Sequence, residues 1–133
     1  MRLHYGEKFN ALTHLAAAVA ALVGTVVLVV LAASGGDPWK IVSVSIYGAT
    51  LLLLYTSSVL YHSTLGRAKN VLRELDHQSI YLLIAGSYTP FCLVTLHGPW
   101  GWSLFGVVWA FVVIGSLQEL RSPGGPRILS VAI

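Results

Sequence analysis

Charge is scarce in this sequence of 133 residues, which has eight Lys or Arg and five Asp or Glu. The resulting 10% is far below the about 25% typical of soluble domains, whereas 56% of the residues are hydrophobic. So few charges cannot cover the large surface of a small soluble domain. The scarcity therefore excludes an ordinary soluble enzyme. It also excludes a nucleic-acid-binding protein, because the basic residues are scattered and form no stripe.

Cysteine is also nearly absent. Cys92 is the single cysteine, so the chain can form no internal disulfide. Its place within an apolar stretch favours a small, buried packing residue. The sequence has no sustained internal repeat and no interdomain linker, which predicts one integral membrane domain over residues 1–133.

Long charge-free runs take up most of the chain. They cover residues 9–36, 41–66 and 77–118. About 20 predominantly apolar residues cross a bilayer as a helix, and the third run is long enough for two crossings with a turn at Gly98 and Pro99. Buried core helices of a soluble protein are a poor alternative, because they are usually shorter. We therefore predict an all-α membrane protein with spans at about 11–33, 41–62, 77–96 and 100–117.

The two ends of the chain raise separate questions. The apolar run after Lys8 is too long for the hydrophobic region of a signal peptide, so we expect it to stay in the membrane as the first span. Residues 128–133 are apolar again after a loop rich in Pro and Gly at 122–126. Six residues cannot cross a bilayer. We expect them to begin a fifth span and the chain to be incomplete at this end.

Basic residues predict the orientation in the membrane. Of the eight, only Lys40 falls in a loop on the side opposite the N-terminus. The positive-inside rule therefore places the N-terminus in the cytoplasm. Trp39, Trp100 and Trp102 then lie at the opposite interface, where amphipathic indoles are favoured.

Polar side chains in membrane segments mark candidate sites, and the first cluster lies at the cytoplasmic end of the first span. At about 100° per residue, Glu7, Asn10 and His14 fall on one face of a helix. The stripe fits a hydrogen-bonded network around a site. It fits equally well an interfacial helix start, with the acid favoured by the helix dipole.

The second cluster ends the second span. Ser58 and His62 are spaced i, i+4 and therefore share a helix face. A neutral imidazole is the commonest side-chain metal ligand, and a hydroxyl one turn away could orient it. The alternative is a histidine that faces the headgroups, with Ser58 bonded to the backbone carbonyl one turn back.

The third cluster leads into the third span, where Asp76 is the last charged residue before the 77–118 run. An Asp at a helix centre costs about 2.5–3.5 kcal/mol on insertion, so this position is constrained. Asp76 either lines a polar cavity or complements the dipole at a helix start. All three clusters fall on one side, so we expect His14, Ser58, His62 and Asp76 to share a pocket open to the inner leaflet. His62 would be one zinc ligand there, and Asp76 would be the candidate carboxylate beside the zinc-bound water.

The sequence at these residues resembles the hemolysin III branch of the progestin and adipoQ receptor family, within a superfamily that includes alkaline ceramidases. The likeness is carried by Glu7-xx-Asn10-xx-Thr13-His14, by Ser58-xxx-His62, and by Asp76-His77-Gln-Ser-Ile80 with Ala85-Gly-Ser-Tyr-Thr-Pro-Phe91. It covers the whole chain. The resemblance implies seven spans in a bacterial inner membrane, a cytoplasmic N-terminus and a zinc site near the inner leaflet.

Residue by residue, the resemblance makes His62 the zinc-binding histidine of the second span. It makes Ser58 the partner of that histidine and Asp76 the acid beside the metal-bound water. Glu7, Asn10 and His14 match the family's first motif. The other two ligands of the family form a His-xxx-His pair in the seventh span, so they are expected beyond Ile133. This chain alone is then expected to bind zinc weakly or not at all.

Three functions from different classes follow. The leading hypothesis is a zinc-dependent hydrolase of a lipid amide or ester, in which His62 holds zinc, Asp76 orients or deprotonates the water and Ser58 supports them. A pore-forming, cytolytic protein is the second, as the family name suggests, although a pore needs a polar stripe along whole spans. A membrane-homeostasis or sensor protein that uses the same site without turnover is the third. Each has membrane lipid as its partner, and the sequence leaves the oligomeric state open.

Overall fold

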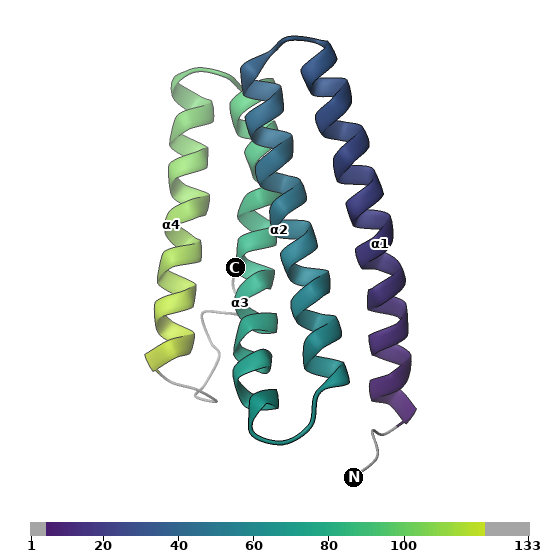
Figure 1. Cartoon of the computed structure of the whole chain (residues 1–133). Helices are drawn as coiled ribbons and strands as arrows, with labels where there is room; N and C mark the ends of the chain where they lie inside the picture. Colours follow the sequence, from purple (N-terminus) through teal and green to yellow (C-terminus); the bar gives the residue numbers. More distant parts are fainter. Residues whose placement is uncertain (1–4, 122–133) are drawn as a thin grey trace.

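The structure, a computed structural model, describes residues 5–121, in which helices are joined by short turns. Four long helices run up and down in chain order (Figure 1). They are α1 (Tyr5–Ser34), α2 (Pro38–Ser63), α3 (Ala68–Pro90) and α4 (Pro99–Arg121), and a π-helical turn η1 (Phe91–Thr95) continues α3. The all-α prediction is confirmed. The expected start of a fifth span at 128–133 lies outside the described residues.

Local sequence explains where α2 begins. The Asp37 carboxylate accepts hydrogen bonds from the backbone N–H groups of Trp39, at 2.9 Å, and Lys40, at 3.4 Å. Pro38 occupies the first turn, where its missing N–H costs nothing. The preceding Gly36 has a φ of 68°, a left-handed conformation that other residues rarely adopt. Asp37 and its neighbours thus join α1 to α2 in a tight turn.

Proline explains how α3 ends. Pro90 lies inside the helical stretch and has no N–H to donate to the preceding turn. The helix continues as the wider turn η1, in which the Leu96 N–H donates to the Phe91 carbonyl at 3.0 Å. α3 and η1 therefore form one continuous helical element that changes its winding at the proline.

Three helices are long and apolar enough to cross a membrane: the stretches Gly6–Ser34, Pro38–Ser63 and Pro99–Glu119. α3 begins at Ala68 rather than near residue 77, so its first turns carry the charged residues of the loop region. Its charge-free part runs on through η1 to Thr95. A membrane crossing by α3 with η1, the span predicted at about 77–96, stays a prediction.

The helices pack side by side in the order of the chain. Within residues 5–121, the backbone of α1 packs against α2 and the backbone of α4 packs against α3 and η1. Only side chains near the helix ends reach further, such as Lys69 of α3 to Glu7 of α1 and Trp102 of α4 to Trp39 of α2. The buried positions are mostly small, as in membrane-helix interfaces, and include Ser43, Ser57, Ser79, Ala85 and Cys92. Large apolar side chains of α1 point outward instead, with Leu12 67% exposed, which suits a lipid-facing surface. The prediction that Cys92 is buried is confirmed.

Glycines set the distance between neighbouring helices. A Cβ atom at Gly48 of α2 would overlap the side chain of Thr25 of α1. A Cβ atom at Gly86 of α3 would overlap Thr50 of α2 in the same way. Small residues let helix backbones approach closely in membranes. These two contacts bring the ends of α1, α2 and α3 into register.

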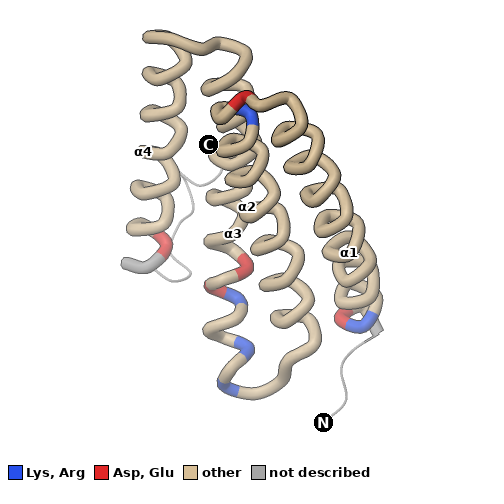
Figure 2. The backbone as a smooth tube through the Cα atoms, turned by 45° about the horizontal axis from the view of Figure 1, so that its top comes forward, with Lys and Arg blue, Asp and Glu red and all other residues tan. Residues whose placement is uncertain are grey.

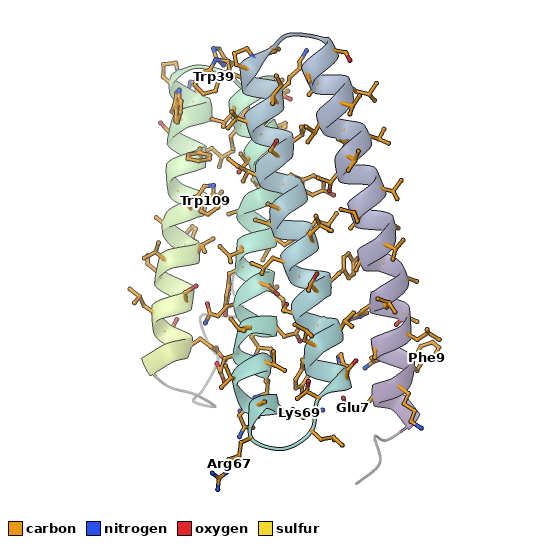
Figure 3. The ribbon with its side chains drawn as sticks, viewed as in Figure 1. Glu7, Phe9, Trp39, Arg67, Lys69 and Trp109 are labelled. Atoms are coloured by element: carbon orange, nitrogen blue, oxygen red, sulfur yellow. The ribbon has the colours of Figure 1, made fainter. Side chains whose placement is uncertain are left out.

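Charged residues gather at one end of the molecule. Figure 2 shows most of the blue and red positions toward the end of the molecule where the described chain begins, with few at the opposite end. Asp37 and Lys40 belong to that opposite end, because they lie at the turn from α1 to α2. The aromatic rings of Trp39 and Trp102 pack at 5.7 Å between centroids, and Trp39 is labelled at the opposite end in Figure 3. The charge asymmetry is thus a property of the fold. The cytoplasmic location of the charged end stays a prediction.

Candidate functional site

The antiparallel pairing of α1 and α2 brings the start of one helix beside the end of the other. Glu7, in the first turn of α1, accepts a hydrogen bond through Oε2 from Nδ1 of His62, in the last turn of α2, at 3.1 Å. Lys69, near the start of α3, donates from Nζ to the same oxygen at 2.8 Å. Figure 3 shows Glu7 and Lys69 at the same end of the molecule. We call these three residues the Glu7–His62–Lys69 cluster.

A tyrosine completes the surroundings of this cluster. The ammonium group of Lys69 lies 4.7 Å from the centroid of the Tyr61 ring, and that ring lies 4.7 Å from the ring of His62. The side chains of His62, Lys69 and Glu7 are 15%, 25% and 28% exposed. Partial burial reduces solvent screening, so these charges interact more strongly than a pair on an open surface.

His14 forms a second polar contact between the same helices. Its Nδ1 lies 2.7 Å from Oγ of Ser58, which is only 3% exposed. The His14 ring also meets the rings of His62 and Tyr55 edge to face, at 5.8 and 5.9 Å. The structure therefore gives Ser58 a different hydrogen-bond partner, His14, from the one that the sequence suggested, His62.

Asp76 and Asn10 lie apart from this contact network. Among the described residues, no hydrogen bond or ion pair reaches the Asp76 carboxylate, although its backbone carbonyl accepts from Ser79 Oγ at 2.6 Å. Ser79 also bonds to Ser57 Oγ at 3.0 Å, which joins α3 to α2. Asn10 is exposed, and its carbonyl accepts from Thr13 Oγ1 at 3.0 Å. The structure thus joins Glu7, His14, Ser58 and His62 and leaves Asp76 and Asn10 outside.

His62 has the hydrogen-bond pattern of a metal ligand. An ionised carboxylate can only accept, so the Glu7 bond requires the His62 proton on Nδ1 and leaves the Nε2 lone pair free in the neutral ring. Metal-binding histidines commonly donate their other ring N–H to a carboxylate. Within the part of the chain that the structure describes, however, no three His, Cys, Asp or Glu side chains converge to hold a metal. These residues fit one ligand and its orienting acid and do not make up a complete site.

Sequence reasoning missed the role of Lys69. We counted it only among the basic residues that predict orientation, yet it contacts Glu7 directly. A usable signal was present, because Glu7 is the single acid before the first predicted span and the basic loop after the second span lies on the same side. Opposite charges placed at one membrane face are expected to pair.

An apolar groove runs along the α1–α2 interface beside these contacts. It has a volume of about 380 Å³ and is lined by small residues of α1, among them Ala17, Ala21 and Gly24, and by Tyr47 and Tyr55 of α2. Tyr55 also contacts His14. Tyr55 therefore links the groove to the polar contacts around His14.

The fold and the site define a helical integral membrane protein with a hydrogen-bonded histidine at its charged end. Residues 4–133 match the family model described as Haemolysin-III related, and the chain belongs to that family. It is 44% identical over 115 residues to the Hemolysin-3 homolog of Bacillus subtilis (strain 168), covering 86% of this chain and 54% of that protein. It is 39% identical over 115 residues to Hemolysin-3 of Bacillus cereus, covering 86% and 52%.

The chain thus spans about half the length of the curated relatives that it matches. No solved structure gives a significant match.

Proposed function

We propose that this protein is a zinc-dependent hydrolase of lipid amides or esters, acting near the inner leaflet of a bacterial inner membrane. The hydrogen bond from His62 to Glu7 carries the proposal, because it leaves Nε2 of a membrane-end histidine free to bind a metal. The family relationship supports the same reading, since the residues that resemble the zinc site of the wider superfamily include His62.

The proposal gives each of these residues a role. His62 would hold zinc through Nε2, and the remaining ligands would come from outside the described residues. A bound zinc ion would supply Lewis-acid activation of water. The Asp76 carboxylate has no hydrogen-bond or ion-pair partner among the described residues, which leaves it available as a proton acceptor. Ser58 would support the site indirectly, through His14.

The groove between α1 and α2 supports a lipid as the substrate. Its walls are mostly aliphatic and aromatic, and Tyr55 lies at both the groove and the His14 contact. A molecule with an apolar chain and a polar amide or ester would place its two parts in these two environments. The geometry therefore favours an amphipathic substrate over a water-soluble one.

Zinc content tests the proposal. The protein is expressed at its natural length and purified in detergent, and its zinc content is measured. The His62→Ala variant should contain less zinc than the unmodified protein. His97→Ala is the matched control, because His97 lies beside Trp39 at the opposite end of the molecule. Equal zinc in the unmodified protein and His62→Ala would remove His62 from the site. Failure to cleave any amide or ester in a lipid panel would refute hydrolysis.

The names of the relatives favour a second candidate, a cytolytic protein. Against it, the charged residues lie near the helix ends and in the first turns of α3, and residues 9–36 and 41–66 contain no charge. Dye leakage from liposomes that persists in His62→Ala and Asp76→Ala would favour lysis. Zinc binding with a lipid-dependent stability change and no product would instead favour a sensor.

A further inference from the structure

One carboxylate oxygen joins three helices at the charged end of the molecule. Oε2 of Glu7, on α1, accepts from His62 Nδ1 of α2 at 3.1 Å and from Lys69 Nζ of α3 at 2.8 Å. The next residue, Lys8, is exposed and takes no part in these contacts. Of these two neighbouring residues, Glu7 therefore faces α2 and α3, and Lys8 offers a control position that lies outside the contacts.

This shared oxygen constrains the His62 ring. A neutral histidine side chain in water carries its proton mainly on Nε2, whereas the bond from Nδ1 of His62 to a carboxylate requires the proton on Nδ1. The Tyr61 ring, 4.7 Å from the His62 ring, contacts it as well. The Nδ1 bond thus fixes both the tautomer and the direction in which Nε2 points.

Lys69 restrains Glu7 in turn. Its ammonium group lies 2.8 Å from Oε2 of Glu7 and, over the Tyr61 ring, 4.7 Å from the ring centroid. A charge-assisted hydrogen bond together with a cation–π contact holds a long lysine side chain in one arrangement. The carboxylate is therefore held from two sides.

We propose that Glu7 is a positioning residue for His62, that Lys69 holds Glu7 in place, and that together they present Nε2 of His62 to a ligand. The inference rests on the proposed function, in which that ligand is zinc. It assigns a role to the first residue of the Glu7, Asn10, His14 stripe. It also explains why the basic residue at position 69 is partly buried.

The test reads the His62 tautomer directly. Long-range proton–nitrogen NMR of histidine-labelled, metal-free protein, at a pH where the ring is neutral, distinguishes Nδ1–H from Nε2–H. The His62 signal is assigned by its loss in His62→Gln. We expect Nδ1–H in the unmodified protein and a change toward Nε2–H in Glu7→Ala. Lys8→Ala is the matched control and should leave the tautomer unchanged.

A conservative variant separates hydrogen bonding from charge. Because one oxygen serves both donors, the carbonyl oxygen of Gln can replace it, so Glu7→Gln should keep His62 in the Nδ1–H form. Zinc affinity should fall about 10- to 100-fold in Glu7→Ala, the usual effect of losing such a partner, and should be retained in Lys8→Ala. A smaller loss is expected in Lys69→Met, which frees the carboxylate without removing it.

Two results would overturn the proposal. One is an Nε2–H form of His62 in the unmodified protein, which can be read even if Glu7→Ala does not fold. The other is the same tautomer in Glu7→Ala as in the unmodified protein. Because the NMR measurement uses metal-free protein, it does not depend on zinc content, so failure of the positioning role and failure of the zinc proposal give different results.

Discussion

Gly48 of α2 lies so close to Thr25 of α1 that a Cβ atom added at the glycine would overlap the threonine side chain. We infer that this contact restricts the register between the two helices, and with it the residues that meet at their ends. In the observed register Glu7 contacts His62, and His14 contacts Ser58. The packing of Gly48 on Thr25 and the contacts of the site thus belong to the same α1–α2 interface.

Replacing Gly48 by Ala should destabilise the protein. Alanine is the better helix former by about 1 kcal/mol, but overpacking an interface typically costs about 1–3 kcal/mol, and the threonine is not a flexible side chain. We expect a net loss in unfolding free energy, measured by denaturant titration in detergent. Gly24→Ala is the control, because a Cβ atom there meets nothing within 4 Å, and it should be neutral or stabilising. A stabilised Gly48→Ala protein would contradict the close packing.

Replacing Ser58 by Ala should weaken the α1–α2 pair. The change removes the 2.7 Å hydrogen bond to His14, and such bonds between membrane helices contribute about 0.6–1.7 kcal/mol. The same denaturant titration measures the loss. Ser87→Ala is the control, since Ser87 is exposed and bonds only to the Ile84 carbonyl of its own helix. Equal effects of the two substitutions would show that the His14 bond contributes nothing.

Replacing Thr89 by Val should remove a bond between α3 and α4. Thr89 is fully buried and accepts from the indole N–H of Trp109 at 3.2 Å while donating to the Ala85 carbonyl. Valine keeps the shape without the hydroxyl, so we expect a loss of about 0.5–1.5 kcal/mol in unfolding free energy. Thr95→Val, at an exposed position, should change it little. A neutral Thr89→Val would show that Trp109 finds another acceptor.

Cysteine labelling should determine the orientation. A membrane-impermeant maleimide applied to intact spheroplasts should modify Lys40→Cys, and should modify Arg67→Cys only after permeabilisation, because basic residues are retained in the cytoplasm. The unmodified protein is the control. Its Cys92 is 1% exposed and should stay unlabelled. Labelling of Arg67→Cys from outside would reverse the topology that we predict.

The sequence predicted the long helices well because apolar length is a strong signal. The span expected at 41–62 corresponds to Pro38–Ser63, and that at 100–117 to Pro99–Arg121. The start of α3 was not predicted, since hydropathy reports the apolar thickness of a span and not the length of the helix. Four charged residues lie in helical turns before that apolar part begins.

The sequence predicted at which end of the helices the site lies, but it did not predict which side chains form hydrogen bonds with each other. Helical spacing placed Glu7 and His14 on one face of α1, and Ser58 and His62 on one face of α2. Spacing within a helix cannot give the register between helices, which depends on the contact of Gly48 with Thr25. Hence the exchange of partners, with Ser58 bonded to His14 and His62 to Glu7, required the structure.

The arrangement of the helices in a row has a consequence for how the molecule assembles. Within residues 5–121, the backbone of α1 packs against α2 and not against α3 or α4, so each helix finds its main docking surface on the one made before it. The bond from Lys69 of α3 to Glu7 of α1 is added at the helix ends once α3 is in place. The helices can therefore associate one at a time in the order in which they are synthesised. Damage to the α1–α2 contact then leaves the α3–α4 contact intact, because these two interfaces lie on different helices.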